Sequence, residues 1–268
     1  MFSQSTDLSS LASALSARCG MAVQVLAHTD STNQQLLSAP SQTQEMRALL
    51  ALSQSAGRGR MGRAWVADTR NTTSVSPAFL GSVAAYTTLS LRELSSLPLR
   101  VGVAVAQYLR TMGCAAGVKW PNDIVIGDAK LGGILIETRP HANGVWAVMG
   151  LGLNWHAAPA IVGRETQCLA QSLGTKPLPQ PTVAAAGLIL ALQTAWQAAH
   201  ARAALDFAAV DTLHGRTVSS LNAAGEPQHT GVAQGINAAG ELGIRDAAKG
   251  TVHWIHSGEL SVRALNVV

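Results

Sequence analysis

Charge is scarce in this sequence. Only 13% of its 268 residues are Asp, Glu, Lys or Arg, whereas 47% are hydrophobic. A chain with so few charges is not expected to carry long charged, disordered tails, and it has enough apolar residues to bury a substantial core. Its length suits one large domain, or a large domain with a small one.

Cysteine is rare as well. The three cysteines, Cys19, Cys114 and Cys168, lie far apart, and no Cys-x-x-Cys pair occurs. An odd number of distant cysteines argues against a disulfide framework and predicts buried thiols in a reducing compartment. The N-terminus lacks the basic and apolar regions of a signal peptide, and the longest apolar run, residues 183–192, is too short to span a bilayer. We therefore expect a cytoplasmic protein that does not enter a membrane.

Several catalytic signatures are missing. The sequence contains no Gly-Lys dipeptide, which excludes a Walker A phosphate loop, and no Gly-x-Ser-x-Gly elbow of a serine hydrolase. It contains no His-Glu-x-x-His, and its eight histidines do not cluster with acidic residues at metal-ligand spacing. The net charge of +4 suits an anionic ligand, but it falls short of the clustered basic stripe of a nucleic-acid-binding protein.

What the sequence does have is a basic stretch at residues 54–65, Gln-Ser-Ala-Gly-Arg-Gly-Arg-Met-Gly-Arg-Ala-Trp. Its glycines and arginines interleave within seven positions: Gly57, Arg58, Gly59, Arg60, Gly62 and Arg63. Glycine lets the backbone approach a ligand closely, and arginine offers a fork of donors that matches phosphate or carboxylate. The stretch predicts a flexible cationic loop that binds an anion. The alternative is a solvated basic surface turn.

The glycine spacing of this stretch also fits the dinucleotide-binding fingerprint Gly-x-Gly-x-x-Gly. That fingerprint requires a helix directly afterwards. Residues 63–73 instead contain β-formers without a helical apolar period, so we reject the dinucleotide interpretation.

The apolar patterns along the chain predict a mixed α/β fold. Helical spacing or helix-start signals occur at four places, and strand patterns occur at several more. The predicted helices cover residues 7–17, 32–37, 98–112 and 183–205. The predicted strands cover residues 21–27, 47–53, 83–91, 118–126, 131–137 and 145–149, and another begins at Trp65.

The pattern changes near residue 210. From there the chain carries short strand patterns separated by turns, at residues 217–221, 231–237, 242–245, 251–255 and 260–262. Short, closely spaced strands are typical of a small β-barrel. We predict a catalytic α/β domain at residues 1–209 and a small barrel domain at residues 210–268.

A second candidate site is Lys119, in the stretch Lys-Trp-Pro-Asn-Asp. Proline stiffens the backbone here, and the lysine stands at the mouth of a predicted strand beside Asn122 and Asp123. These groups could orient a metal-bound polyphosphate. The alternative is a solvated lysine.

Taken together, these motifs resemble the biotin–protein ligases. The resemblance rests on Asp-Ser-Thr-Asn at 30–33, the stretch at 54–65, Lys-Trp-Pro-Asn-Asp at 119–123, Lys-Leu-Gly-Gly-Ile-Leu-Ile-Glu at 130–137 and Gly-Leu-Gly-Leu-Asn at 150–154. It extends to Gly-Val-Ala-Gln-Gly-Ile at 231–236 and Ser-Gly-Glu-Leu-Ser-Val-Arg at 257–263, so it covers roughly residues 20–265. It implies a mixed-sheet catalytic domain flanked by helices and a C-terminal SH3-like β-barrel.

The resemblance also implies a two-step reaction that uses biotin, ATP and Mg²⁺. The biotin carboxylate attacks the α-phosphate of ATP, and a lysine of a biotin carboxyl carrier protein then takes the biotinyl group from the adenylate. The implied catalytic residues are Lys119 and Arg60, the latter in a lid, and Asp123 is implied as a support for Mg²⁺. The implied biotin-binding residues are Ser31, Thr32, Asn33, Gln54, Arg58, Gly59, Arg60, Lys119, Gly132, Gly133 and Gly150. The implied ATP-binding residues are Arg58, Arg60, Arg63, Trp65, Lys119, Asn122, Lys130 and Asn154.

Other functions stay open beside this one. A lipoate–protein ligase shares the fold and the adenylation chemistry, although the arginine-rich loop favours biotin. A non-catalytic biotin-sensing or nucleic-acid-binding module is a second alternative. Only about 20 residues precede the first predicted strand, so we expect neither the N-terminal DNA-binding domain of many bacterial relatives nor DNA binding. Residues 70–76 depart from the family pattern, which leaves the adenine contacts open, and the protein could be a monomer or a homodimer.

Overall fold

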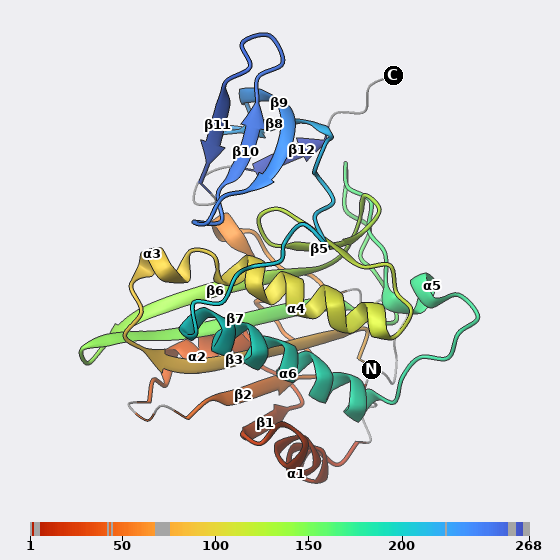
Figure 1. Ribbon diagram of the computed structural model, residues 1–268. Helices are drawn as coiled ribbons and strands as arrows, with labels where there is room; N and C mark the ends of the chain where they lie inside the picture. Colours follow the sequence, from red (N-terminus) through yellow and green to blue (C-terminus); the bar gives the residue numbers. More distant parts are fainter. Residues whose placement is uncertain are drawn as a thin grey trace.

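The computed structural model describes residues 2, 6–41, 43, 45–67, 76–222 and 224–256, together with the backbone of residues 261–264. Its helices are α1 (Leu8–Cys19), α2 (Thr32–Ser38), α3 (Leu91–Leu94), α4 (Leu97–Thr111), α5 (Leu169–Leu173) and α6 (Pro181–His200), with one 3₁₀ turn, η1 (Arg60–Gly62). Its strands are β1 (Ala22–Leu26), β2 (Arg47–Ala51), β3 (Ala78–Thr87), β4 (Gly117–Lys119), β5 (Asp123–Ile126), β6 (Ala129–His141), β7 (Gly144–Asn154), β8 (Thr217–Leu221), β9 (Pro227–Ile236), β10 (Leu242–Arg245), β11 (Val252–Ile255) and β12 (Ser261–Ala264). They form a seven-stranded sheet with helices on both faces and a separate five-stranded sheet (Figure 1).

The larger sheet is mixed. Its strands lie in the order β1-β2-β3-β7-β6-β5-β4; β1 and β2 are parallel, and every other pair is antiparallel. Helices α4 and α6 pack together on one face, with α1 against α6 and β1, while α2 covers part of the other face (Figure 1). The predicted mixed α/β architecture is therefore confirmed.

Alternation along the strands divides the core between the two faces. Leu50 of β2 and Val83 of β3 join the main cluster under α4 and α6. Their neighbours Leu49 and Ala84 join a second cluster with Leu36 of α2. Successive strand residues point to opposite faces of the sheet, so a continuous apolar run is buried on both faces.

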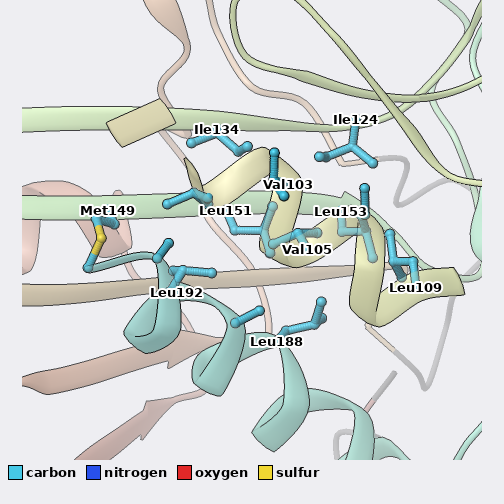
Figure 2. Packing of buried hydrophobic residues seen from close by; sticks show 14 of the residues in the cluster. Val103, Val105, Leu109, Ile124, Ile134, Met149, Leu151, Leu153, Leu188 and Leu192 are labelled. Carbon is cyan, nitrogen blue, oxygen red and sulfur yellow. The ribbon is translucent and has the colours of Figure 1, made fainter. Parts of the chain in front are cut away.

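The main core packs the larger sheet against α4 and α6. Figure 2 shows Met149, Leu151 and Leu153 of β7 beside Leu188 and Leu192 of α6. All five side chains are at most 2% exposed. Burial of each such side chain stabilises the fold by about 1.5–3 kcal/mol. Because helices pack on this face, the opposite face, where α2 is short, is the more open one.

Helix α6 is longer than its most apolar run suggests. By length and composition its 20 residues could cross a membrane, yet 56% of its most apolar window is buried inside the protein. It packs against α4, α1 and β3. Its place in the core therefore accounts for its apolar character.

Most predicted elements are confirmed with shifted ends. The hairpin predicted after Lys119 is formed by β5 and β6, with Gly127 at φ 57° in its turn. The single strand predicted over residues 118–126 is wrong, because a turn at residues 120–122 divides it into the antiparallel strands β4 and β5. The strand predicted over residues 83–91 is β3, which begins earlier, at Ala78. It ends at Thr87 because Ser90 and Glu93 form a capping box that begins α3. The strand predicted from Trp65 is wrong for residues 65–67, which lie in a loop.

The second sheet follows the change of pattern near residue 210. Its strands are antiparallel in the order β11-β10-β9-β8-β12. The connection to it continues the edge of β4, since the Val118 amide donates to the Val210 carbonyl at 2.7 Å. Part of the last predicted strand and family motif, residues 257–260, lies outside the described residues, as do residues 68–75.

Candidate active site

A cavity of about 870 Å³ opens on the face of the larger sheet that α4 and α6 do not cover. Its walls come from the N-terminus of α2, the loop at residues 54–66, the β4–β5 connection and the loop at residues 159–166. Sixteen of the predicted site residues line it: Ser31, Thr32, Asn33, Gln54, Arg58, Gly59, Arg60, Arg63, Trp65, Lys119, Asn122, Asp123, Lys130, Gly133, Gly150 and Asn154. The fold thus brings together motifs that are separated by up to half of the chain.

One row of paired residues forms the floor of this cavity. The strand register places Leu80, Gly152, Gly133, Asp123 and Lys119 opposite one another on β3, β7, β6, β5 and β4. Residues directly opposite on neighbouring strands point to the same face. The row therefore runs from an apolar side chain, across two bare glycines, to a carboxylate and an ammonium group.

The glycines of the floor allow other groups to approach the sheet. A Cβ on Gly150 would lie 2.1 Å from Oδ1 of Asn33, and a Cβ on Gly152 would lie 2.4 Å from the indole of Trp65. Gly132, predicted for the same purpose, lies on the opposite side, where a Cβ would meet Leu153 of the core at 2.9 Å. Of the adjacent pair in β6, only Gly133 faces the cavity, because successive strand residues alternate.

At the end of the cavity near α2, the side chains of Ser31, Thr32, Asn33 and Gln54 are polar and uncharged. The amide and hydroxyl of Thr32 both donate to Oε1 of Gln54, at 2.8 and 3.0 Å. Ser82 donates to the Thr32 hydroxyl at 2.7 Å and also lies 2.6 Å from Oδ1 of Asn33. Ser31 caps α2, with its hydroxyl accepting from the Gln34 amide. These bonds satisfy buried polar groups and hold them in fixed directions.

Ser82 was not predicted as a site residue. It is 2% exposed and sits within an apolar strand. Its only signal in the sequence is a hydroxyl in the middle of the run Phe-Leu-Gly-Ser-Val-Ala. Such a hydroxyl needs a partner when buried, but its partners in α2 become visible only in the folded chain.

Arg58 is held by a second unpredicted residue, Glu137. Its guanidinium lies 2.7 Å from Oε1 of Glu137 and also donates to the side chain of Gln34. Oε2 of Glu137 accepts from Asn33 at 2.9 Å. Since the side chain of Arg58 is 45% exposed, this ion pair ties an outer part of the loop to β6 without burying the charge.

The glycine–arginine stretch is a tight loop. The Gly59 amide donates to the Arg63 carbonyl at 2.7 Å, and the Trp65 amide donates to the Gly57 carbonyl at 2.8 Å. Met61 and Gly62 both have positive φ, 57° and 70°. Only the single turn η1 forms here, so the rejection of the dinucleotide fingerprint is confirmed.

The opposite end of the cavity carries a cluster of cations around one carboxylate. Asp123 pairs with Lys130 at 2.6 Å and with Arg164. Burial raises the pKa of Asp123, but these two cations outweigh it and hold the pKa below its usual range. Arg60 approaches the same region and donates to Oδ1 of Asn122 at 3.3 Å. Three cations face one carboxylate, which leaves an excess of positive charge suited to a polyanion.

Lys119 lies at the edge of this cluster with a free ammonium group. Within the described part of the chain, its Nζ has no hydrogen-bond or ion-pair partner. Burial lowers the pKa of Lys119, and Arg164 lowers it further against the opposing effect of Asp123. A half-buried ammonium without a partner costs free energy unless an anion approaches it. Lys119 is therefore ready to bind an anionic group.

Trp65 and Asn154 complete the wall near Lys130. The Lys130 ammonium lies 5.3 Å from the centre of a Trp65 ring, and the indole nitrogen is buried without a partner among the described residues. Asn154 donates to the carbonyls of Lys130 and Gln167, while its Oδ1 is buried and likewise unpartnered there. Two unsatisfied groups in one wall are consistent with a ligand that supplies a donor and an acceptor.

Arg164 and its loop were missed at the level of sequence. Residues 159–166 follow β7 and line the cavity, and Gly163 there has φ 71°. The sequence Ala-Pro-Ala-Ile-Val-Gly-Arg marks a loop, but it carries no motif. Asp123 becomes the partner of Arg164 only because the end of β7 and the start of β5 meet at the cavity.

The comparisons with known proteins agree with this geometry. The model of the biotin/lipoate A/B protein ligase family matches residues 25–154. A biotin–[acetyl-CoA-carboxylase] ligase of Mycobacterium tuberculosis is 30% identical over 227 residues, which cover 81% of this chain and 81% of that protein. A protein of the same name from Paracoccus denitrificans is 37% identical over 146 residues, 50% of this chain and 55% of that protein. The chain spans about half the length of this and some other curated relatives that it matches.

A solved structure has a similar fold over most of the chain. The biotin protein ligase from Aquifex aeolicus in complex with biotin and ATP superposes with a TM-score of 0.71 and 23% identity, covering 91% of this chain and 99% of that chain. At this identity the likeness establishes the fold, whereas the Mycobacterium relative establishes the family. The chain belongs to the biotin protein ligases, within the biotin/lipoate A/B protein ligase family.

Proposed function

We propose that the chain is an ATP-dependent biotin–protein ligase, which activates biotin as biotinyl-5′-AMP and transfers the biotinyl group to a specific lysine of a biotin carboxyl carrier protein. One observation carries the proposal. An uncharged polar pocket at α2 and a free ammonium, Lys119, lie at opposite ends of one floor that glycines keep bare. Biotin has the matching order of groups: a polar, uncharged ring system, an apolar chain and a carboxylate.

The pocket at α2 suits the ureido ring of biotin. Thr32, Gln54 and Asn33 supply hydroxyl and amide groups to the cavity, and hydrogen bonds among them and from Ser82 behind them hold their directions. A buried urea-type group requires such partners because its desolvation is otherwise costly. From β3 to β4 the floor crosses four strand spacings, about 19 Å, which leaves room for the chain, the carboxylate and a phosphate in line.

The cationic end suits the first reaction step. The biotin carboxylate and the α-phosphate of ATP are both anions, so their approach requires nearby positive charge. Lys119, Lys130 and Arg60 supply it from different segments. A carboxylate oxygen forms the new bond to the α-phosphorus, and the bond to the pyrophosphate oxygen breaks. In the second step the carrier lysine attacks the biotinyl carbonyl, an amide forms, and AMP leaves.

Mg²⁺ belongs to the proposal as a companion of ATP. Among the described residues no group of three or more His, Cys, Asp or Glu side chains could hold a metal ion. Both oxygens of Asp123 already have cationic partners. The site therefore fits a magnesium ion that is held mainly by phosphates, with Asp123 as a counter-ion; its role as a magnesium ligand stays a prediction.

The proposal extends to the organisation of the chain. We assign residues 1–209 to a catalytic domain and residues 210–268 to an SH3-like barrel domain, built on the five-stranded sheet. A cytoplasmic location is in keeping with three buried free cysteines. We expect no DNA binding and no membrane contact, and a monomer or homodimer.

The test is direct. The purified protein is incubated with a recombinant biotin carboxyl carrier domain, biotin and MgATP, and the carrier is weighed by mass spectrometry. We expect one biotinyl group on one lysine and pyrophosphate release that requires biotin. Modification by lipoate in place of biotin would make the chain a lipoate ligase, and no modification with either acid would refute the proposed activity.

A further inference from the structure

The residue after Lys119 connects the active site to the second sheet. Trp120 is 1% exposed, and its indole nitrogen donates to the carbonyl of Gly240 at 3.0 Å. Gly240 lies in the turn between β9 and β10, so the bond joins two units that are 120 residues apart in sequence. The donor of this hydrogen bond, Trp120, directly follows Lys119 in the sequence.

The turn that accepts this bond is rigid. Oδ1 of Asn237 accepts from the amides of Ala239 and Glu241 at 2.9 and 3.1 Å, and its carbonyl accepts from the Gly240 amide at 2.9 Å. Gly240 has φ 80°, which favours glycine. A turn fixed by its own side chain can hold a partner in a defined position.

The same turn rests on the start of α4. A Cβ on Gly240 would lie 3.2 Å from Leu99 and 3.3 Å from Ser96. The hydroxyl of Ser95 reaches the Ala239 carbonyl at 3.4 Å. The turn is thus wedged between α4 and Trp120, and it has little freedom to move away from either.

The strand that carries Lys119 depends on such support. β4 has three residues and lies at the edge of the larger sheet. On its outer side Val118 donates to Val210 at 2.7 Å and accepts from the Thr212 amide at 3.2 Å. The connection to the second sheet therefore holds the residue before Lys119, and the β9–β10 turn holds the residue after it.

We infer that the second sheet positions the Lys119 ammonium for adenylate formation through the hydrogen bond from Trp120 to Gly240. Trp120 is a positioning residue, because its side chain is 1% exposed, its indole nitrogen is bonded to Gly240, and it acts through its neighbour Lys119. The inference rests on the proposed function and deepens it: the C-terminal unit takes part in the first step, before any carrier protein arrives. A lysine side chain on a short edge strand keeps its direction only when the backbone on both sides is fixed.

The first test removes the bond and keeps an aromatic ring. In Trp120→Phe we expect kcat for pyrophosphate release from biotin and ATP to fall about tenfold, with both KM values within about twofold. Trp146→Phe is the matched control. Trp146 is also fully buried, and its indole also donates to a backbone carbonyl, that of Leu36, at 2.8 Å. Both variants should lower the midpoint of urea unfolding, but only Trp120→Phe should lower kcat about tenfold.

A double-mutant cycle separates positioning from general loosening. If Trp120 acts through Lys119, Trp120→Phe should change the residual rate by less than about twofold once Lys119 is replaced by alanine. A tenfold loss in both backgrounds would overturn the inference, because Trp120 would then act independently of the lysine.

A second pair of variants tests the turn itself. Gly240→Ala introduces a side chain at positive φ that meets Leu99, whereas Gly250→Ala introduces one at φ 70° in the β10–β11 turn, with nothing within 4 Å. Both substitutions carry similar backbone strain. We expect Gly240→Ala to reproduce the kcat loss of Trp120→Phe and Gly250→Ala to leave kcat within about twofold. Equal kcat in the two glycine variants would contradict a role for the turn.

The last measurement does not depend on activity. Acetic anhydride labels accessible amines, and mass spectrometry compares Lys119 with Lys130 in the same molecule. In Trp120→Phe, which lacks the hydrogen bond to Gly240, the labelling ratio of Lys119 to Lys130 should rise at least about threefold. The reason is that local opening of the chain exposes the Lys119 ammonium. An unchanged ratio would overturn the inference. If the wild-type protein forms no biotinyl-adenylate while the ratio still changes, the proposed function fails and the positioning of Lys119 stands.

Discussion

Replacing Lys119 by alanine is the most decisive perturbation of the proposed active site. The side chain is half-buried, its pKa is lowered by burial and then by Arg164, and it has no partner among the described residues. It therefore contributes little to the fold. Its charge becomes useful only when an anion enters the cavity, so the substitution should leave stability almost unchanged and reduce the rate of adenylate formation strongly.

The expected size follows from the electrostatics of the site. Two unit charges about 4 Å apart attract by about 4 kcal/mol at the effective dielectric constant of a protein surface. Loss of one donor to a developing anion lowers rates by about 10²–10³-fold, which corresponds to about 2.7–4 kcal/mol. The two values agree. We expect Lys119→Ala to lower kcat for pyrophosphate release by about 10²–10³-fold.

The assay is pyrophosphate release with saturating biotin and MgATP, together with thermal unfolding of both proteins. The control is Lys249→Ala, since Lys249 is exposed on the β10–β11 turn, far along the chain from the cavity residues. Its rate should match the wild type. A rate for Lys119→Ala within a few-fold of wild type, with normal folding, would refute the role of Lys119.

The pH dependence offers a second check on the same residue. Because burial lowers the pKa of Lys119, the free enzyme should lose its ammonium at a lower pH than an ordinary lysine does. The quantity kcat/KM reports ionisations of the free enzyme. It should fall on the alkaline side as pH rises through this lowered pKa, and Lys119→Arg should shift that fall to higher pH, because the guanidinium stays charged.

Three further substitutions test other parts of the site. Gly150→Ala places a Cβ 2.1 Å from a side-chain oxygen of α2, so we expect the KM for biotin to rise about tenfold and that for ATP to change less; equal changes in steady-state kinetics would contradict a biotin-specific effect. Arg60→Gly removes a guanidinium from the loop, so biotinyl-adenylate should escape and biotinylate bystander albumin, which a blot for biotin detects; normal retention of the adenylate would refute a lid role for Arg60. Asp123→Asn leaves Lys130 and Arg164 without their shared carboxylate, and we expect the free energy of unfolding in urea to fall by about 3–5 kcal/mol.

The last substitution has both a control and a pH signature. Asp128→Asn breaks a more exposed pair with Arg216 and should cost about 1 kcal/mol or less. The pKa of Asp123 is raised by burial, but Lys130 and Arg164 hold it below its usual range. Its contribution to stability is thus present above the unfolded-state pKa and is lost as pH falls through the folded-state value. Equal losses of stability in the two variants at neutral pH would contradict a special role of Asp123.

Local patterns were sufficient for most of the secondary structure. The helix at α4 and the hairpin of β5 and β6 follow from apolar spacing and a Gly-Asp turn. The prediction of a strand from Trp65 is wrong at residues 65–67, because β-forming residues do not show whether a neighbouring strand is available for pairing. Trp65 is held instead by the hydrogen bond that its amide donates to the Gly57 carbonyl, and its indole packs over Gly152, where a Cβ would not fit.

The candidate site likewise contains residues that the local sequence points to and residues that only the fold brings in. Lys119 and the glycine–arginine loop could be chosen as candidates because their residue types suggest an anion site and their motifs resemble those of the family. Ser82 and Arg164 carry no such signal, and Glu137 was visible only as the end of a motif. Each of these three gains its contact from a partner far away in sequence. Gly132 illustrates the limit, because one residue of register decides whether a glycine faces the cavity or the core.

The sequence by itself determined the class of this protein: an α/β chain with a loop rich in glycine and arginine, a lysine beside Trp-Pro and a strand-rich C-terminal part. These features depend on residue type and short spacing, which local chemistry controls. Only the tertiary structure decided that Leu80, Gly152, Gly133, Asp123 and Lys119 form one floor. It alone decided that the β9–β10 turn meets Trp120 beside the lysine. Strand order and register set these contacts, and both result from the burial of the whole core rather than from any single segment.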